Sequence, residues 1–362
     1  MTLYPRLITS ITALQGRVGP YPSLRYSVSQ VLHQSDEDVI ALAPRPPVDI
    51  IQEDKNREVI GSLQQLAGYL SYSEATDPHR VLKHLRGIGE WIGNRLLTPR
   101  CLCCLGGALP RTIEILTDQQ EIPWELTWVN NDFLSRQAVH ARYPFVSRAR
   151  HQTCKYSEPP RMALVIGRIA GLQLAQAEID GIVSAYHSRF GSNPEIFSGE
   201  QVTKKLLLGL LQETTSTEQP YDVIHFIGHG DAQIDQVWLE LPGSPFLDND
   251  LPPRLRGNPV VFWNACHSAV STEGKYRYQA DVFDAFGSRL LAGGASHFIG
   301  SLFPVFDTTA CGFALAFYRE AFEGHPLGVA VFNAKATIDG KDPLVHTYAL
   351  YGSPAVRLVR NG

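Results

Sequence analysis

The sequence predicts an α/β protein with a mostly parallel sheet sandwiched between helices. From residue 161 onward, short apolar segments alternate with longer segments whose apolar residues recur at helical spacing. The short segments are apolar on both faces, as the strands of a parallel sheet covered by helices on both sides are. Right-handed crossovers bring the carboxyl ends of such strands to one edge, so we expect a site at that edge.

The individual elements follow from these patterns. Five segments have the composition of short buried strands: residues 163–167, 195–197, 222–228, 259–265 and 296–300. Four segments have helical spacing: residues 172–190, 201–210, 282–291 and 308–322. Ser198 and Gln201 have the spacing of a capping box, so we expect the second of these helices to open there.

The N-terminal part of the chain has weaker patterns. Residues 43–47 and 156–161 are rich in proline and are predicted to be connectors. Between them, residues 59–70 and 81–97 are predicted to be helices, while residues 112–116 are short and ambiguous. The periodicity alone does not decide whether this part folds independently.

Composition excludes several classes of protein. The chain has 362 residues, of which 44% are hydrophobic, enough for one large or two compact cores. A net charge of −4 is unlike that of proteins that bind nucleic acids or anionic membranes. No uninterrupted apolar run is long enough to span a membrane, and the first ten residues lack a signal-peptide pattern. The six cysteines do not form a disulfide framework, so we expect a cytoplasmic protein with no nucleic-acid or membrane partner.

Two predicted strand ends carry reactive side chains. The strand at residues 222–228 runs into His229 and Gly230, and the strand at residues 259–265 runs into Cys266. If these strands are neighbours in a parallel sheet, an imidazole and a thiol lie side by side. A cysteine nucleophile needs this geometry, because the imidazole takes the thiol proton or stabilises the thiolate.

The backbone at these positions suits the same chemistry. The N–H groups of Gly230 and Cys266 could together form an oxyanion hole.

Two alternatives remain open from spacing alone. Cys266 could be a small core residue, since free cysteine is among the most buried residue types. His225 lies on the same strand face as His229 and could be a rival base, or a core histidine with its hydrogen bonds satisfied.

No cofactor or metal is predicted. A group of cysteines and one histidine invites a zinc interpretation but lacks the usual ligand spacing: Cys101, Cys103, Cys104, His151 and Cys154. Residues 167–171 (GRIAG) follow a strand but complete neither nucleotide-binding pattern. Ser353 lacks the nucleophile elbow of serine hydrolases.

Several short segments resemble the CHAT group of caspase-like, separase-related cysteine proteases. They are IPWEL (122–126), IHFIGHGD (224–231), VVFWNACHSA (260–269), LFPVFD (302–307), AFYREAFEG (316–324) and TYALYGSP (347–354). Their order and spacing match over roughly residues 59–358.

The resemblance implies a cysteine endopeptidase with the caspase–haemoglobinase fold. By this resemblance His229 is the catalytic histidine and Cys266 the nucleophile. Residues 156–362 would form the catalytic half, with residues 1–155 as an N-terminal region, a degenerate caspase-like half packed against it. The alternative is a catalytically silent interaction module with the same fold.

Specificity is the point at which this sequence departs from the family pattern. Many relatives that cut after arginine or lysine carry an aspartate two residues before the nucleophile, whereas this chain has Asn264. Asp307 is therefore the candidate acid for a basic substrate side chain, although it could instead cap the helix that follows it. Asp231, next to Gly230, is a second candidate for substrate binding.

The resemblance also implies a protein substrate and control of activity. Bacterial relatives suggest a role in antiviral defence with a gasdermin-like pore-forming target. Relatives are commonly held inactive until a sensor protein or cleavage activates them. The polar loop at residues 267–281 directly follows Cys266, so we expect gating to act there.

Overall fold

A single large sheet forms the centre of the molecule. The computed structural model describes residues 78–96, 112–117, 123–144, 156–212, 219–233, 236–265, 280–303 and 305–359, together with four N-terminal strands. Among the described residues, twelve strands form one sheet in the order β10-β9-β11-β15-β16-β17-β8-β5-β1-β2-β3, with β4 paired to β2. Their bounds are β1 Arg6–Val18, β2 Tyr21–His33, β3 Val39–Leu42, β4 Asp49–Gln52, β5 Thr112–Thr117, β8 Val139–Pro144, β9 Met162–Ile166, β10 Glu195–Phe197, β11 Val223–Gly228, β15 Val260–Ala265, β16 His297–Ser301 and β17 Tyr348–Tyr351.

The C-terminal part of this sheet confirms the predicted parallel arrangement. Strands β10, β9, β11, β15 and β16 are parallel to one another, and β17 pairs antiparallel with β16. All residues of β9, β11, β15 and β16 are buried. Strands buried on both faces are those of a sheet with a helical layer on each side, as the sequence predicts.

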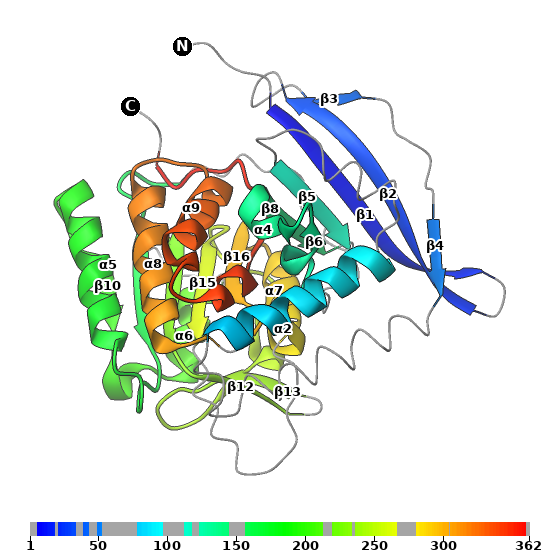
Figure 1. Cartoon of the computed structure of the whole chain (residues 1–362). Coiled ribbons are helices and arrows are strands. Elements are labelled where there is room, and N and C mark those ends of the chain that lie inside the picture. The colour runs from blue at the N-terminus through cyan, green and yellow to red at the C-terminus, as the bar shows by residue number, and fades with distance from the viewer. Residues whose placement is uncertain are drawn as a thin grey trace.

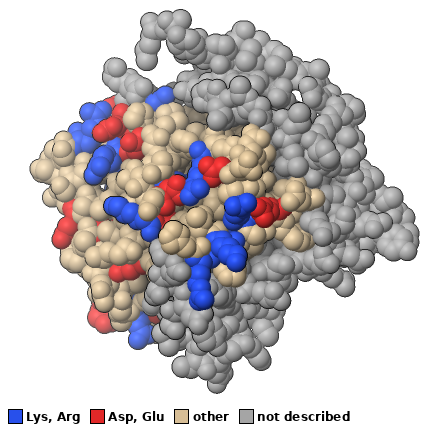
Figure 2. Space-filling view, in the orientation of Figure 1, with Lys and Arg blue, Asp and Glu red and all other residues tan. Residues whose placement is uncertain are grey.

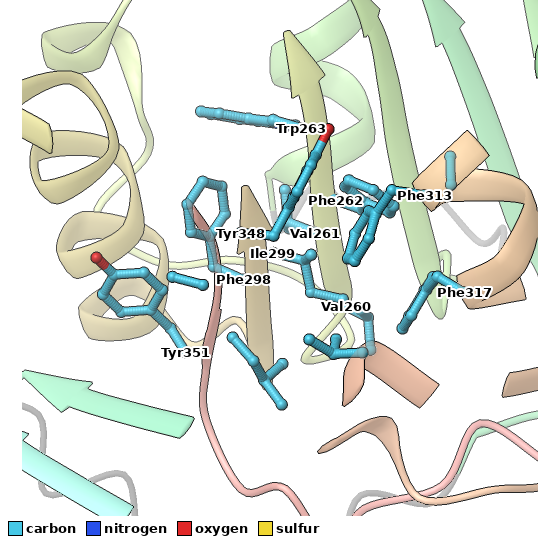
Figure 3. Packing of buried hydrophobic residues seen from close by; sticks show 14 of the residues in the cluster. Val260, Val261, Phe262, Trp263, Phe298, Ile299, Phe313, Phe317, Tyr348 and Tyr351 are labelled. Carbon is cyan, nitrogen blue, oxygen red and sulfur yellow. The ribbon is translucent and has the colours of Figure 1, made fainter. Parts of the chain in front are cut away.

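Adjacent residues of β15 contact the two helical layers. The ring of Phe262 packs against Phe313 and Phe317 of α8 (Asp307–Phe322), with centroid distances of 5.9 and 5.5 Å. The ring of Trp263 packs instead against Phe286 of α7 (Ala280–Gly293), at 4.4 Å. Because successive side chains of a strand point to opposite faces, α8 and α7 lie on opposite sides of the sheet (Figures 1 and 3).

The remaining helices complete these layers. Helix α8 packs against α5 (Ala175–Phe190) and α9 (Leu327–Asp339), and these helices lie in front of the sheet in Figure 1. Helix α6 (Lys204–Leu211) follows β10. The α6 N-cap is Thr203, whose side chain accepts from Leu206 N, whereas Ser198 makes no side-chain cap bond. The predicted capping box is therefore wrong, because a separate 3₁₀ turn, η4 (Gly199–Gln201), precedes the helix.

The N-terminal strands extend the same sheet. Strand β8 pairs parallel with β17 at Arg142 and Tyr351, and β5 pairs parallel with both β8 and β1. Helix α2 (Pro78–Trp91) continues into a short π-helix (Ile92–Leu96), which confirms the helix predicted over residues 81–97. The helix predicted over residues 59–70 lies outside the described residues. Strands β8 and β17 join the two parts into one sheet. The domain boundary near residue 155 stays a prediction.

Charged side chains of both signs are mixed on the face shown in Figure 2. Acidic and basic residues alternate over the described part of this surface, without a large area of one sign. Within the described part of the chain, no helix is both long and apolar enough to cross a membrane.

A buried ionic cluster lies where the N-terminal strands meet α9. Glu125 and Arg142 are both fully buried, and Arg142 donates through Nε to Glu125 Oε1 at 2.6 Å and through a second bond to Oε2. Lys335 Nζ lies 3.4 Å from His140 Nε2, and His140 Nε2 lies 4.0 Å from Glu125 Oε1. The cluster joins β8 to α9 across the interior.

Burial controls which of these groups are charged. Burial would raise the pKa of Glu125, but the Arg142 guanidinium outweighs it and holds that pKa below its usual value. Burial lowers the pKa of Lys335 to about 7, helped by Arg142 and opposed by Glu125, and burial also lowers the pKa of His140 to about 3. Above pH 7 the cluster therefore holds one anion and one cation, which is an electrically neutral arrangement.

The lysine makes stability depend on pH. The pKa of Lys335 is about 7 in the folded chain and 10.5 ordinarily, so between these values the unfolded state binds a proton that the folded state does not. The free energy of unfolding therefore gains a contribution that grows as pH rises above 7, on the order of 1 kcal/mol per pH unit. Urea denaturation at pH 7 and pH 9 should show a smaller gain in Lys335→Met than in the wild type. Equal gains in both proteins would contradict this assignment.

Candidate active site

The pairing of β11 with β15 brings the two predicted catalytic positions to one edge. The strands are parallel, with Val223 opposite Val260 and Gly228 opposite Ala265. The next residues along the two strands are His229 and Cys266, and neighbouring strands lie about 4.8 Å apart. Cys266 itself lies outside the described residues, whose last member here is Ala265. The expected juxtaposition therefore rests on the register of the residues immediately before it.

His229 is held by the loop that follows β9. Its side chain is largely buried, with 9% of the residue exposed, and Nε2 lies 2.9 Å from the carbonyl oxygen of Ala170. Because a carbonyl oxygen only accepts, the bond requires the proton on Nε2, and the neutral ring then has Nδ1 as its basic nitrogen. The backbone of His229 is also fixed, since its N donates to Arg168 O at 3.3 Å and its O accepts from Glu240 N at 2.9 Å.

Gly230 lies close to the end of β15. A Cβ added to Gly230 would be 3.2 Å from Cβ of Ala265, the residue before Cys266. Such a contact is tighter than most between real Cβ atoms, so a side chain at position 230 would push the two strand ends slightly apart. Gly230 begins β12 (Gly230–Gln233), which pairs with β13 (Gln236–Leu239) at the lower end of the molecule in Figure 1. Asp231 is paired there with Trp238 through the backbone, and its side chain lies outside the described residues.

Asn264 is a buried part of the core. Only 2% of it is exposed, and its amide donates to Glu178 Oε1 at 2.8 Å and to the carbonyl oxygen of Ala310 at 3.0 Å. Its own oxygen accepts from the hydroxyl of Tyr348 at 2.6 Å. Both amide hydrogens are therefore engaged within the fold, and Asn264 ties β15 to α5, α8 and β17 directly beneath the site.

Glu178 joins the two strands from below. Its Oε1 accepts from Asn264 and lies 2.9 Å from Nε2 of His225, which is fully buried. The His225 ring also packs on Phe262 and Tyr318, at centroid distances of 4.6 and 5.3 Å. Of the two roles left open for His225, this position is that of a core histidine, but its hydrogen bonds are only partly satisfied: Nε2 is bonded to Glu178, whereas the buried Nδ1 has no partner among the described residues.

Asp307 acts on α5 rather than on its own helix. The N-cap of α8 is Phe306, so the expectation that Asp307 caps the helix after it is wrong. Its Oδ2 instead accepts from the backbone N of Leu174, the residue before α5, at 2.7 Å. Asp307 thereby fixes the end of the loop that carries Ala170.

Two carboxylates, those of Glu178 and Asp307, lie close enough to Cys311 to affect its pKa. Burial raises the pKa of Cys311 to about 11, and the charges of Glu178 and Asp307 add to that shift. Cys311 is 6% exposed, which agrees with its predicted place in the core. Asp307 is half-buried, so it is the more accessible of the two acids.

Two contributors to this site were not identified from the sequence. Ala170 acts through its backbone carbonyl, which a sequence pattern does not show. Residues 167–171 were considered only as an incomplete nucleotide-binding pattern. Glu178 interrupts the buried face of α5 between Ala175 and Ile179. A charged residue among buried helical positions is a signal that could have identified it.

Side chains with metal-ligand geometry occur elsewhere. Among the described residues, Glu320, Glu323 and His325 have ligand atoms within 4.8 Å of one another. Glu320 lies about 20 Å along α8 from Asp307, since a helix rises about 1.5 Å per residue. The cysteine and histidine group considered above for zinc lies outside the described residues.

The position of the Glu178 carboxylate beside Asn264 predicts how stability would depend on pH in Asn264→Asp. Asn264→Asp places a second buried carboxylate against Glu178, and two such neighbours cannot both ionise cheaply. The pair then has a raised pKa in the folded state, so stability is kept at low pH and lost as pH rises through that pKa.

Thermal unfolding should therefore show a larger loss for Asn264→Asp at pH 8 than at pH 5. The control Asn264→Leu removes the same hydrogen bonds without adding charge and should be destabilised to a similar extent at both values. A loss for Asn264→Asp that does not change with pH would contradict the proximity of the two carboxyl groups.

Comparison with known proteins gives both a family and a fold. A model of the CHAT domain matches residues 87–351. No curated protein matches the chain. Two crystal structures of the Saccharomyces cerevisiae separase–securin complex align with TM-scores of 0.53 and 0.56, at 11% and 12% identity, over 95% of this chain and 30% of the matched chain. The Arg-specific cysteine proteinase gingipain R aligns with a TM-score of 0.49 at 13% identity, over 83% of this chain and 76% of that chain.

The family match and the separase alignments agree with the α/β fold described above. The separase alignments, at this low identity, show a shared fold, and this chain spans 30% of the length of the matched chain. The family match covers the described strands β11 and β15 and all of the helices that flank them. The chain therefore belongs to the CHAT domain family and shares its α/β fold with separase.

Proposed function

We propose that this protein is a cysteine endopeptidase that uses Cys266 as nucleophile and His229 as base. The observation that carries the proposal is the parallel register of β11 and β15, which makes His229 and Cys266 the next residues at one sheet edge. The bond from His229 Nε2 to Ala170 O supports it further, because it leaves Nδ1 as the basic nitrogen.

The reaction follows from these positions. Nδ1 of His229 accepts the thiol proton, and the Cys266 sulfur attacks the carbonyl carbon of the scissile bond. The negative charge on the carbonyl oxygen is stabilised by the backbone N–H groups of Gly230 and Cys266. The imidazolium then protonates the leaving nitrogen, the C–N bond breaks, and the acyl group remains on sulfur. Water, activated by His229, hydrolyses the thioester and restores the thiol.

The acids near the site favour a basic residue before the scissile bond. Asp307 is half-buried, and Glu178 is buried. Asn264 carries no charge and donates both amide hydrogens within the fold, so it contributes by holding Glu178 rather than by binding a cation. We assign the recognition of arginine or lysine to Asp307, with Asp231 as a second acid beside Gly230.

The proposal includes a specific protein substrate and controlled activation. The resemblance to bacterial relatives suggests a gasdermin-like target, an activating sensor or processing step, and a cytoplasmic role in antiviral defence. The loop at residues 267–281 follows Cys266 directly, and a change in its amide exchange on activation would support gating there.

The activity is tested with fluorogenic peptides varied at the residue before the scissile bond. The wild type should cleave them, and Cys266→Ala and His229→Ala should lose at least about 100-fold in kcat/KM, since base and nucleophile act in the same step. Asp307→Asn should reduce the preference for arginine over leucine at that residue. His225→Gln serves as the control for a core histidine and should keep cleavage if it folds.

Two outcomes would contradict the peptidase proposal. Equal turnover by the wild type and Cys266→Ala would exclude the proposed nucleophile. Absence of turnover, together with an unchanged cellular phenotype in Cys266→Ala, would favour the silent interaction module.

A further inference from the structure

A pocket of about 410 Å³ lies beside His229, and none of the residues that line it takes part in the proposed reaction. Its apolar walls come from Trp238, Leu241, Pro242 and Pro245, and its rim carries Arg168 and Glu240. The rim charges form a loose pair, since Arg168 NH1 lies 4.0 Å from Glu240 Oε2, and the Arg168 side chain is 65% exposed. The lining is therefore mixed: four apolar side chains lie beside polar surface that includes one charge of each sign.

The pocket is connected to His229 through the backbone. Arg168 O accepts from His229 N at 3.3 Å, and Glu240 N donates to His229 O at 2.9 Å. Arg168 N also donates to Glu240 O at 2.9 Å, which closes a ring of hydrogen bonds around the three residues. The two rim residues are thus direct neighbours of the proposed base.

The sheet order puts the pocket on one side of the reacting groups. Strands β9, β11 and β15 are consecutive neighbours, so their ends present Arg168, His229 and Cys266 in that order across the edge. A carbonyl carbon bonded to sulfur lies at Cys266, and the departing nitrogen must lie next to the imidazole that protonates it. A peptide chain that continues from that nitrogen, away from the sulfur, passes His229 and reaches Arg168 and Glu240.

We propose that this pocket binds an apolar side chain of the substrate on the leaving-group side of the scissile bond. The inference rests on the proposed function, and it assigns a second specificity site, distinct from the acids that face the preceding residue. The tryptophan and the two prolines provide rigid apolar walls, which suit an aliphatic or aromatic side chain better than a charged one.

The test uses internally quenched peptides with arginine before the scissile bond and leucine, glycine or aspartate at each of the two positions after it. The wild type should cleave a leucine peptide about 10-fold or more faster, in kcat/KM, than its glycine counterpart at one of these positions. Trp238→Ala and Ser244→Tyr should bring this ratio towards one, the first by removing a wall and the second by filling the pocket from its exposed rim. Ile196→Ala, at the exposed edge strand β10, is the matched control and should keep the wild-type ratio.

A substrate without leaving-group residues separates the two proposals. An arginyl peptide with an aminocoumarin leaving group reports on the chemistry alone. If the wild type cleaves this compound but cleaves the leucine, glycine and aspartate peptides at equal rates, the pocket assignment is overturned and the peptidase proposal stands. Cleavage of neither kind of substrate, together with an unchanged cellular phenotype in Cys266→Ala, would overturn both proposals. A leucine preference that survives in both pocket variants would also overturn the assignment.

Discussion

The pairing of β11 with β15 is the constraint on which the rest of the site depends. Both strands are buried along their whole length, so the packing of both faces fixes their register. A slip of β15 by one residue would turn Phe262 away from α8 and Trp263 away from α7. Parallel pairing ends with Gly228 opposite Ala265, and the proposed catalytic residues are the next in sequence after these two. The hydrophobic core thus determines the spacing of the two strand ends that precede the proposed catalytic residues.

Buried polar groups make this edge rigid. Glu178 is hydrogen-bonded to β11 through His225 and to β15 through Asn264, while Asp307 holds the residue before α5. The same loop supplies the Ala170 carbonyl to His229. A polar network of this kind is stable in the interior only when its members are paired, so replacing one partner leaves the others without theirs. In the middle of the strand order, β8 is held in a comparable way: Arg142 pairs with buried Glu125, and His140 contacts Lys335 of α9.

Between residues 161 and 322 the sequence predicts the main strands and helices well, whereas it predicts neither the four strands before residue 53 nor α9. It predicts the side-chain network poorly. Alternating buried strands and helices are visible in the apolar pattern, and His229 and Cys266 are recognisable as the residues that follow two such strands. Asp307 illustrates the limit. Its position before a helix predicts a cap of α8, yet it bonds to Leu174, more than a hundred residues away in the chain. Long-range partners such as Ala170 for His229, or Glu178 for Asn264, depend on how α5 packs, which local spacing does not encode.

The reactivity of Cys266 towards iodoacetamide, followed by peptide mass spectrometry as a function of pH, tests the pairing of thiol and imidazole most directly. The account predicts that at about pH 6 Cys266 is alkylated faster in the wild type than in His229→Ala, because a neighbouring imidazolium lowers a thiol pKa. Cys311 is the internal control, since burial raises its pKa to about 11 and it should stay unmodified in the folded protein. The same pH profile for Cys266 in both proteins would contradict the central claim.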